Sequence, residues 1–358
     1  MSLAKKRILT ISILSVTLLV LFVASIFIGS SNMSFVDGLK ALFGQGQVSH
    51  QTIIYNIRLP RIIAAILAGI ALSISGVIMQ TMSNNVMASP STLGVSNSAV
   101  LGANIAIIIL GGGIIATSGG NVIISNPYFI SGIAFVFALV STLLVLGLSR
   151  IKKYNAATTV LIGVTFGMLC TGLTTIIQYF ASDNALQSAI YWSFGDLGRA
   201  SYQDDLIILV ITVIAIVFFL IFSYRYNAIL LGDSSASTLG INLKVFRFIS
   251  LLLASLLTAV VVSLVGIIGF VGLVIPQIIR KILGNDHKFM IIGSSLFGAS
   301  FLLICDILSR VLMNGITIPV GAITSIIGAP IFIIILLRGR RKAWLKLIIY
   351  LLPIIKMI

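Results

Sequence analysis

Long apolar runs separated by short polar segments make up most of the chain. A helix needs roughly 20 apolar residues to cross a bilayer, and in hydrocarbon a helix satisfies its own backbone polar groups. No charged residue lies between residues 62 and 149, a length that predicts three spans broken at 83–92 and 111–127. Other runs predict spans at 8–28, 157–180, 205–223, 289–312 and 319–337.

Residues 248–279 form another charge-free run, with basic residues on both sides. Matching flanks indicate an even number of crossings, yet the run is too short for two full spans. We therefore expect one full helix and one short helix, with a turn near Gly266 and Gly269. Pro276 would lie inside the short helix.

The basic residues predict the orientation of these spans. Lys and Arg collect in short cytoplasmic loops. The chain has 23 of them, and with both termini in the cytoplasm 18 would lie inside and five outside. The fold class is thus an all-α polytopic membrane protein of about ten transmembrane helices. The run at 8–28 exceeds a signal peptide core and lacks a cleavage site, so we expect a retained span. Residues 343–358 are expected to lie in the membrane interface.

Composition supports this reading. Only 9% of residues are charged and 59% are hydrophobic, whereas soluble domains carry about 25% charged residues. A net charge of +15 can indicate nucleic-acid binding, but here the charges sit where membrane topology places them, and no nucleic acid is expected. Small residues recur at every fourth position, as in Ala65, Gly69 and Ser73, which lets helices approach closely.

Few residues could carry out chemistry. The chain has no Gly-Lys dipeptide, so it lacks the G-x-x-x-x-G-K-[ST] phosphate loop. Its two histidines, His50 and His287, lie far apart in the sequence, and we expect no metal, cofactor or catalytic site. Asp306 is the one clear intramembrane acid. It could serve a proton relay, but Arg310 follows at i+4, and we favour a helix ion pair between them.

Several motifs, in order from about residue 50 to 342, resemble the permeases of the iron-complex and cobalamin ABC importer family (FecCD-type, type II importers). They are RLPR (58–61), AGIALSISGVIMQ (68–80), ASPSTLGVSNSA (88–99), WSFGDL (192–197), LLGDSSASTLGI (230–241), GFVGLVIPQIIR (269–280), DILSR (306–310) and IPVGAITSIIGAPIF (318–332). Three positions depart from the family pattern: Val86 replaces the proline of Asn-Pro, Gln277 replaces a histidine, and Asp233 replaces a glutamate.

The resemblance implies a membrane-spanning permease domain over 1–342 in the bacterial cytoplasmic membrane, and not an enzyme. Its partners would be a cytoplasmic ABC ATPase dimer, a second permease, identical or paralogous, and an extracytoplasmic substrate-binding protein. The expected cargo is a ferric siderophore, chosen over haem and cobalamin on family frequency. The competing hypothesis is an ion- or proton-coupled secondary transporter, which would need intramembrane relays.

The resemblance also assigns roles to individual residues. The loop containing Asp233 would couple to the ATPase, the alternative being a merely solvated loop. Here Asp233 could cap a helix begun at Ser234, while Ala236 and Leu239 would share one apolar face. In full, the coupling residues are Gly232, Asp233, Ala236, Leu239 and Gly240.

Two outer groups are also predicted. Arg58, Arg61 and Arg310 would dock the binding protein through bidentate contacts to carboxylates, unless Arg58 and Arg61 only snorkel to headgroups. An outer gate would include Tyr191, Trp192 and Phe194.

Overall fold

The computed structural model describes residues 3–29, 34–112, 115–116, 122–123, 126–151, 156–313 and 317–337. The predicted interfacial tail at 343–358 lies outside these residues. Within them, eight helices are long and apolar enough to cross a membrane. They are α1 (Leu3–Phe27), α4 (Leu59–Met82), α6 (Pro127–Ile151), α7 (Ala156–Tyr179), α9 (Tyr202–Ile221), α12 (Leu243–Val265), α14 (His287–Val311) and α15 (Val320–Leu337).

Shorter elements connect these spans. The helices are α2 (Phe35–Leu42), α3 (Val48–Thr52), α5 (Val95–Asn104), α8 (Asp183–Ser193), α10 (Ser223–Leu230), α11 (Asp233–Thr238) and α13 (Val271–Leu283). The single turns are η1 (Ile53–Arg58), η2 (Pro90–Leu93), η3 (Ile105–Ile109) and η4 (Leu197–Arg199). Two-residue strands β1 (Ile115–Ala116) and β2 (Val122–Ile123) pair antiparallel.

The predicted all-α polytopic fold class is confirmed. The third predicted span is shorter than expected, because its helix runs only from Val95 to Ile109 as α5 and η3. The charge-free run at 248–279 divides as predicted into a full helix, α12, and a short one, α13. Gly266 ends α12 with a φ of +82°, and Pro276 lies inside α13.

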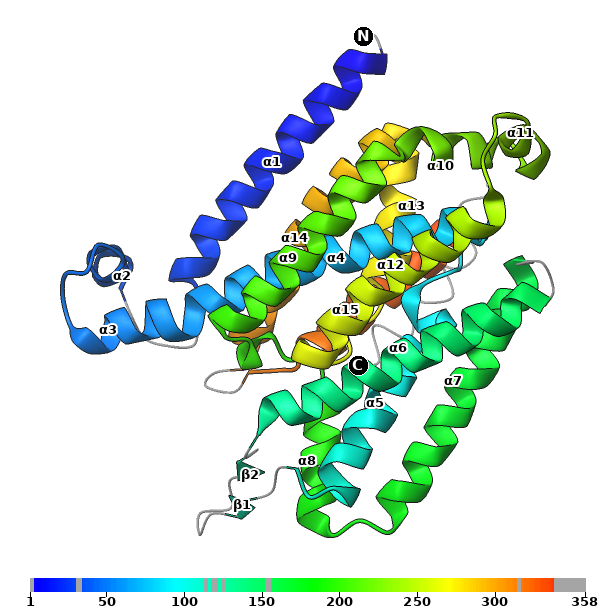
Figure 1. The fold of residues 1–358 in the computed structure, drawn as a ribbon. Coiled ribbons are helices and arrows are strands. Elements are labelled where there is room, and N and C mark those ends of the chain that lie inside the picture. Colours follow the sequence, from blue (N-terminus) through cyan, green and yellow to red (C-terminus); the bar gives the residue numbers. More distant parts are fainter. Residues whose placement is uncertain are drawn as a thin grey trace, which may run out of the picture.

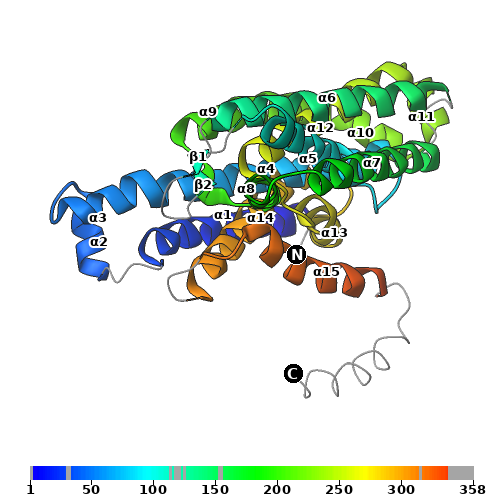
Figure 2. The same cartoon turned by 90° about the horizontal axis from the view of Figure 1, so that it is seen from below.

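Helix α4 is the centre of the bundle. Figure 2 shows α4 between a layer with α9 and α12 and a layer with α1 and α14. Most of its residues are buried, whereas α1 stands at the periphery with one side against α14 (Figure 1). A helix that is apolar on all sides can occupy such a buried position, so α4 contacts α9, α12, α13 and α14 at once.

Small residues allow this crowding, as predicted. A Cβ built on Gly69 of α4 would lie 2.5 Å from the carbonyl oxygen of Gly298 in α14. A Cβ built on Gly76 would lie only 1.8 Å from the carbonyl oxygen of Gly272 in α13. The backbones of α4 and α13 therefore meet at a point where neither helix has room for a side chain.

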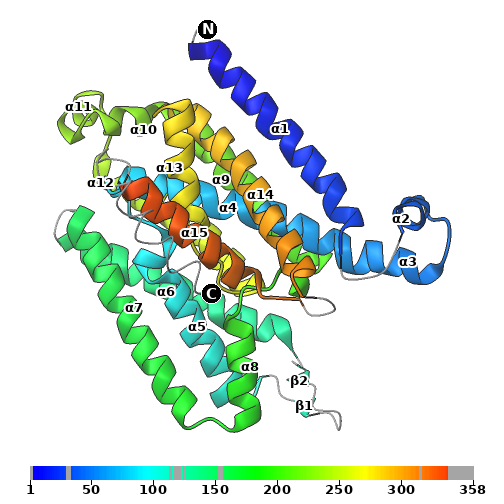
Figure 3. The same ribbon diagram turned by 180° about the vertical axis from the view of Figure 1, so that it is seen from behind.

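The two ends of the bundle carry different short elements. Figure 1 places the start of α1 and helix α11 at one end, and α2, α3 and α8 toward the other. Seen from behind, α15 lies across α13 and α14 (Figure 3). The charge pattern predicts that the end with α11 is cytoplasmic, and this orientation stays a prediction.

Substitution of Gly76 tests the contact between α4 and α13. Gly76→Ala places a methyl group against backbone that cannot move aside, and overpacking of this kind costs about 1–3 kcal/mol or more. We expect a lower midpoint of thermal unfolding in detergent. Gly147→Ala in α6 is the control, because nothing lies within 4 Å of its added Cβ. Equal midpoints for the two variants would contradict this contact.

Candidate functional site

A buried carboxylate lies between two arginines at the end of α14. Asp306 has no exposed surface. Arg61 of α4 donates from Nε to Oδ1 of Asp306 at 2.6 Å, and Nη2 of Arg310 lies 2.9 Å from Oδ2. The ion pair on α14 is therefore part of a three-residue cluster. The third member, Arg61, is 245 positions away in the sequence.

The arginines of this region also hold the end of α1. Arg310 donates from Nη1 to the carbonyl oxygens of Ser25 (3.1 Å) and Ile28 (2.9 Å). Arg58 donates to the carbonyl oxygens of Ile26 (2.6 Å) and Phe27 (3.1 Å). The last carbonyls of a helix lack intrahelical partners and carry partial negative charge, so two guanidinium groups satisfy them there. This contact fastens a helix that otherwise has little buried surface.

The positions of these arginines bear on the predicted docking role. Arg58, Arg61 and Arg310 are only 4%, 6% and 5% exposed. Their guanidinium groups contact Asp306 and the end of α1, and Arg61 also lies 3.9 Å from Asp196, so they hold α1, α4 and α14 together. Binding-protein docking by these three residues stays a prediction, and it requires them to exchange partners within the chain for partners outside it.

The predicted coupling residues lie in and beside α11, with a glycine near each end of this helix. Gly232 has a φ of +114° and Gly240 a φ of +76°, values that favour glycine. The predicted cap is wrong: α11 begins at Asp233, and this side chain makes no cap hydrogen bond. Asp233 instead accepts a hydrogen bond from Arg247 of α12 at 2.6 Å, because the turn at Gly232 directs it toward α12.

The predicted apolar face of α11 is also absent. Ala236 is fully buried and Leu239 is 68% exposed, so their side chains point in different directions. Ala236 anchors α11 to the bundle, while Leu239 remains available to a partner. A groove of about 450 Å³ lies between α11 and the start of α12, with Asp233, Ser237, Asn242 and Lys244 among its lining residues.

A polar cluster that sequence reasoning missed joins α10, the helix before α11, to α4. His287 is fully buried, with Nδ1 2.7 Å from Oδ1 of Asn227 in α10 and Nε2 2.7 Å from Oγ1 of Thr81 in α4. Asn227 also accepts the backbone N–H of His287 at 2.9 Å. Satisfied buried networks of this kind fix helices rigidly relative to one another. In the sequence, the one sign of this cluster is a histidine, His287, next to the start of a predicted span.

The outer segment after α7 contains the three predicted gate residues. Trp192 is buried, and Arg199 lies over its ring at 5.6 Å and donates to its carbonyl oxygen at 3.0 Å. Burial lowers the pKa of Arg199, an effect that the charge of Asp196 opposes. Tyr191 and Phe194 are 61% and 42% exposed. Only these two of the three can contact a molecule entering from this side.

The outer segment is tied to the centre of the bundle. Phe194 pairs with Ile267 in the turn between α12 and α13, and Gly195 accepts a hydrogen bond from the backbone of Gly321 at 3.2 Å. A shift of α13 or α15 would therefore move the two exposed aromatic rings. Among the described residues, no group of three or more His, Cys, Asp or Glu side chains could hold a metal ion.

Comparisons with known proteins agree with this architecture. The FecCD transport family matches residues 17–338. An ABC transporter permease protein of Methanocaldococcus jannaschii is 41% identical over 94% of this chain and 97% of its own length. The vitamin B12 import permease of Vibrio vulnificus is 32% identical (92% and 94% covered), and the hemin transport permease of Yersinia pestis 33% (80% and 84%).

A solved structure is similar throughout. A chain described as a metal-chelate type ABC transporter in an inward-facing conformation superposes with a TM-score of 0.78 and 26% identity. The match covers 92% of this chain and 98% of the other.

The chain belongs to the FecCD transport family. It is a multi-pass permease subunit of an ABC importer in the cytoplasmic membrane, and not an enzyme, since ATP hydrolysis belongs to partner subunits.

Removal of the shared carboxylate tests the arginine cluster. Asp306→Asn leaves Arg61 and Arg310 buried without their counter-charge, and breaking such a pair costs about 3–5 kcal/mol. We expect a large loss of thermal stability and faster proteolysis of the outer end of α1. Asp183→Asn removes an exposed carboxylate and serves as the control. If both variants unfold at the same temperature as the wild type, the cluster does not stabilise the fold.

Proposed function

We propose that this chain forms, with a second permease, the translocation path of a binding-protein-dependent importer that carries ferric siderophores. The permeases of this family that resemble it transport vitamin B12 and hemin, and the similar solved structure is of the metal-chelate type. All of these cargoes are large chelates with a bound metal. A siderophore is the member of this class that we choose for this chain.

The observation that carries this function is the projecting helix α11. It stands at the end of the bundle (Figure 1), it is flanked by two glycines with positive φ, and it presents Leu239 outward. A permease without a phosphate loop must receive mechanical work from another subunit, and an exposed short helix is a suitable contact. The cluster of Asn227, His287 and Thr81 then joins this contact to α4.

The structure gives less support to an ion- or proton-coupled secondary transporter. Such a transporter needs acids that exchange protons along a path. Asp306 instead lies between two arginines, and its contacts hold helices together rather than forming part of a path. Asp204 and Asp205 are also buried, but both lie in the first turn of α9, at one end of that helix, and not along the length of a span.

The energy source of uptake distinguishes an ABC importer from an ion- or proton-coupled secondary transporter. With its ATPase and binding protein, the chain should support ⁵⁵Fe-siderophore uptake in cells that stops on ATP depletion and survives an uncoupler at constant ATP. The uptake of haem and cobalamin should be measured in parallel. Uptake that follows the proton gradient would exclude the ABC mechanism, and capture of cobalamin alone would exclude the siderophore.

A single exposed side chain tests the coupling contact. Leu239→Asp places a charge in the contact between α11 and the ATPase. We expect at least about a tenfold loss of ATP-driven uptake, the effect of roughly 1.4 kcal/mol at an interface. Thermal stability should not change, since Leu239 is 68% exposed.

Val48→Asp is the matched control for this variant. Val48 is a 76% exposed residue of α3, toward the opposite end of the bundle. Copurification of the ATPase should be lost only with Leu239→Asp. Normal copurification and uptake in that variant would show that α11 is only a solvated loop.

A further inference from the structure

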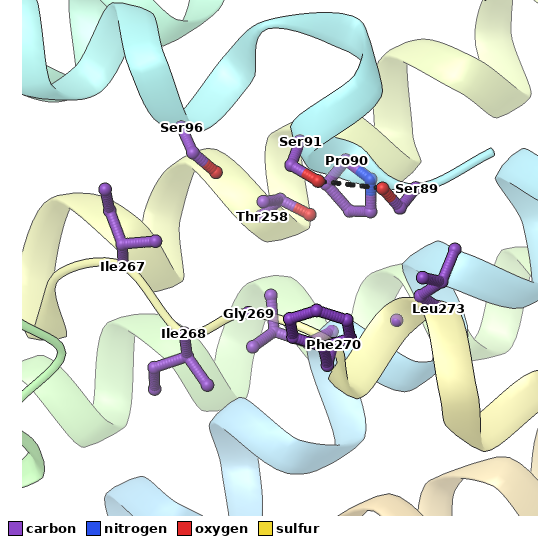
Figure 4. Close-up of a pocket in the computed structure, with 12 residues that line it drawn as sticks. Ser89, Pro90, Ser91, Ser96, Thr258, Ile267, Ile268, Gly269, Phe270 and Leu273 are labelled. Carbon is purple, nitrogen blue, oxygen red and sulfur yellow. Dashed lines mark hydrogen bonds between the residues drawn. The ribbon is translucent and has the colours of Figure 1, made fainter. Parts of the chain in front are cut away.

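Two short helices begin at one cavity. Helices α5 and α13 both start next to a partly open space of about 150 Å³ lined by η2, α12 and the turn before α13 (Figure 4). Ser89, Ser91, Ser96 and Thr258 contribute hydroxyl groups to its wall, and Phe270 and Leu273 are among its apolar members. Because α4 reaches this level at Leu72, halfway along its length, the cavity lies in the middle of the bundle.

The starts of α5 and α13 have no side-chain caps. The residue before α5 is Gly94 and the residue before α13 is Phe270, and neither side chain accepts a hydrogen bond from the helix. In contrast, Ser201, Asn242 and Asp286 cap α9, α12 and α14. The first N–H groups of a helix lack intrahelical partners and carry about half a positive charge together. In α13 the N–H groups of Val271 and Leu273 donate to the carbonyl oxygens of Gly269 and Phe270, which leaves the N–H of Gly272. The positive ends of both helix dipoles still lie next to the cavity.

Ser96 provides an independent sign of a ligand. This residue in the first turn of α5 is 6% exposed, and its hydroxyl has no hydrogen-bond partner in the part of the chain that the structure describes. Figure 4 shows the hydroxyl directed into the cavity. A serine hydroxyl without a partner in the chain is able to donate a hydrogen bond to a bound group. The oxygens of Ser89 and Ser91, by comparison, already contact each other at 2.8 Å.

The surroundings contain no charge that would repel or replace an anion. All lining residues belong to the charge-free segments 62–149 and 248–279. Ile267, Ile268, Phe270 and Leu273 give one side of the cavity an apolar surface. Where water is scarce, hydrogen-bond donors and helix ends act more strongly on a charge. Broken helices in transporters use their N-termini in this way toward anionic substrate groups.

The backbone at this place is also strained. Phe270 has a φ of +66°, a value that is costly for a bulky residue. Its Cβ lies so close to α15 that a Cβ on Gly328 would be 2.4 Å away. The start of α13 is thus held in an unusual conformation by α15. A ligand at the cavity would contact the segment that joins α12, α13 and α15.

We propose that this cavity binds a small monovalent anionic group during transport. The group is a carboxylate arm of the cargo chelate or free chloride, which share the same chemistry here. A volume of about 150 Å³ accepts a carboxylate with a few waters, since one water occupies about 30 Å³ in the liquid. Ser96, the first N–H groups of α5 and the N–H of Gly272 in α13 donate hydrogen bonds to it. The carboxylate source rests on the proposed function, whereas anion binding itself does not.

Anion binding can be measured without knowledge of the cargo. The complete transporter, purified in detergent, is titrated with trifluoroacetate, and saturable broadening of its ¹⁹F signal is followed. We expect Ser96→Ala to weaken binding about tenfold, the value of one hydrogen bond to a charged group. Ser96→Asp should abolish binding, because its carboxylate occupies the cavity.

Ser255→Ala is the matched control. Ser255 of α12 is buried with an unpartnered hydroxyl, yet it does not line the cavity. This variant should bind trifluoroacetate as the wild type does. Thermal unfolding of each variant shows whether it is folded, and Ser96→Ala provides the test if Ser96→Asp is not. Absence of saturable binding in the wild type, or equal binding by folded Ser96→Ala, overturns the anion site.

Two further measurements identify the source of the anion. Uptake is compared for a ferric trihydroxamate with a free carboxylate arm and for the same chelate with that arm as an amide. If the bound anion is a carboxylate of the cargo, Ser96→Asp should lower uptake of the carboxylate chelate at least about tenfold more than uptake of the amide chelate. Equal losses, together with displacement of trifluoroacetate by chloride, assign the site to chloride. No uptake of either chelate by the wild type rejects the siderophore function but leaves the anion site standing.

Discussion

The burial of Asp306 between Arg61 and Arg310 is the constraint on which the arrangement of the outer end depends. Charges removed from water must be paired, so α4 and α14 can pack only in the register that brings Arg61 to Asp306. The same arginine cluster satisfies the last carbonyls of α1 through Arg310, with Arg58 beside it. One carboxylate thereby orients three helices, and it explains why a charged cluster is present in so apolar a chain.

Helix α4 connects the arginine cluster with the opposite end of the bundle. It meets the arginine cluster at Arg61, contacts α13 backbone to backbone at Gly76, and joins the polar cluster of His287 at Thr81. These three contacts lie along one continuous helix. A displacement of α11 by an ATPase would pass through Asn227 and His287 to α4. This arrangement is suited to a permease whose movement is driven from outside the chain.

The middle of the bundle has a different character from its two ends. Its cavity has hydroxyl groups and uncapped helix starts but no charged side chain. The strained Phe270 connects this region with α15, and the turn at Ile267 connects it with the exposed rings of the outer segment.

The sequence by itself determined most of the spans, the short helix after Gly266 and the family, because hydrophobic runs, glycines and motifs are local in the chain. It also indicated the pair of Asp306 and Arg310, which are one helical turn apart. Only the tertiary structure decided that Arg61 joins them, that Asp233 contacts Arg247 instead of capping α11, and that Ala236 and Leu239 point apart. These features depend on which helix faces are packed together, and side chains distant in sequence meet only after the helices are packed.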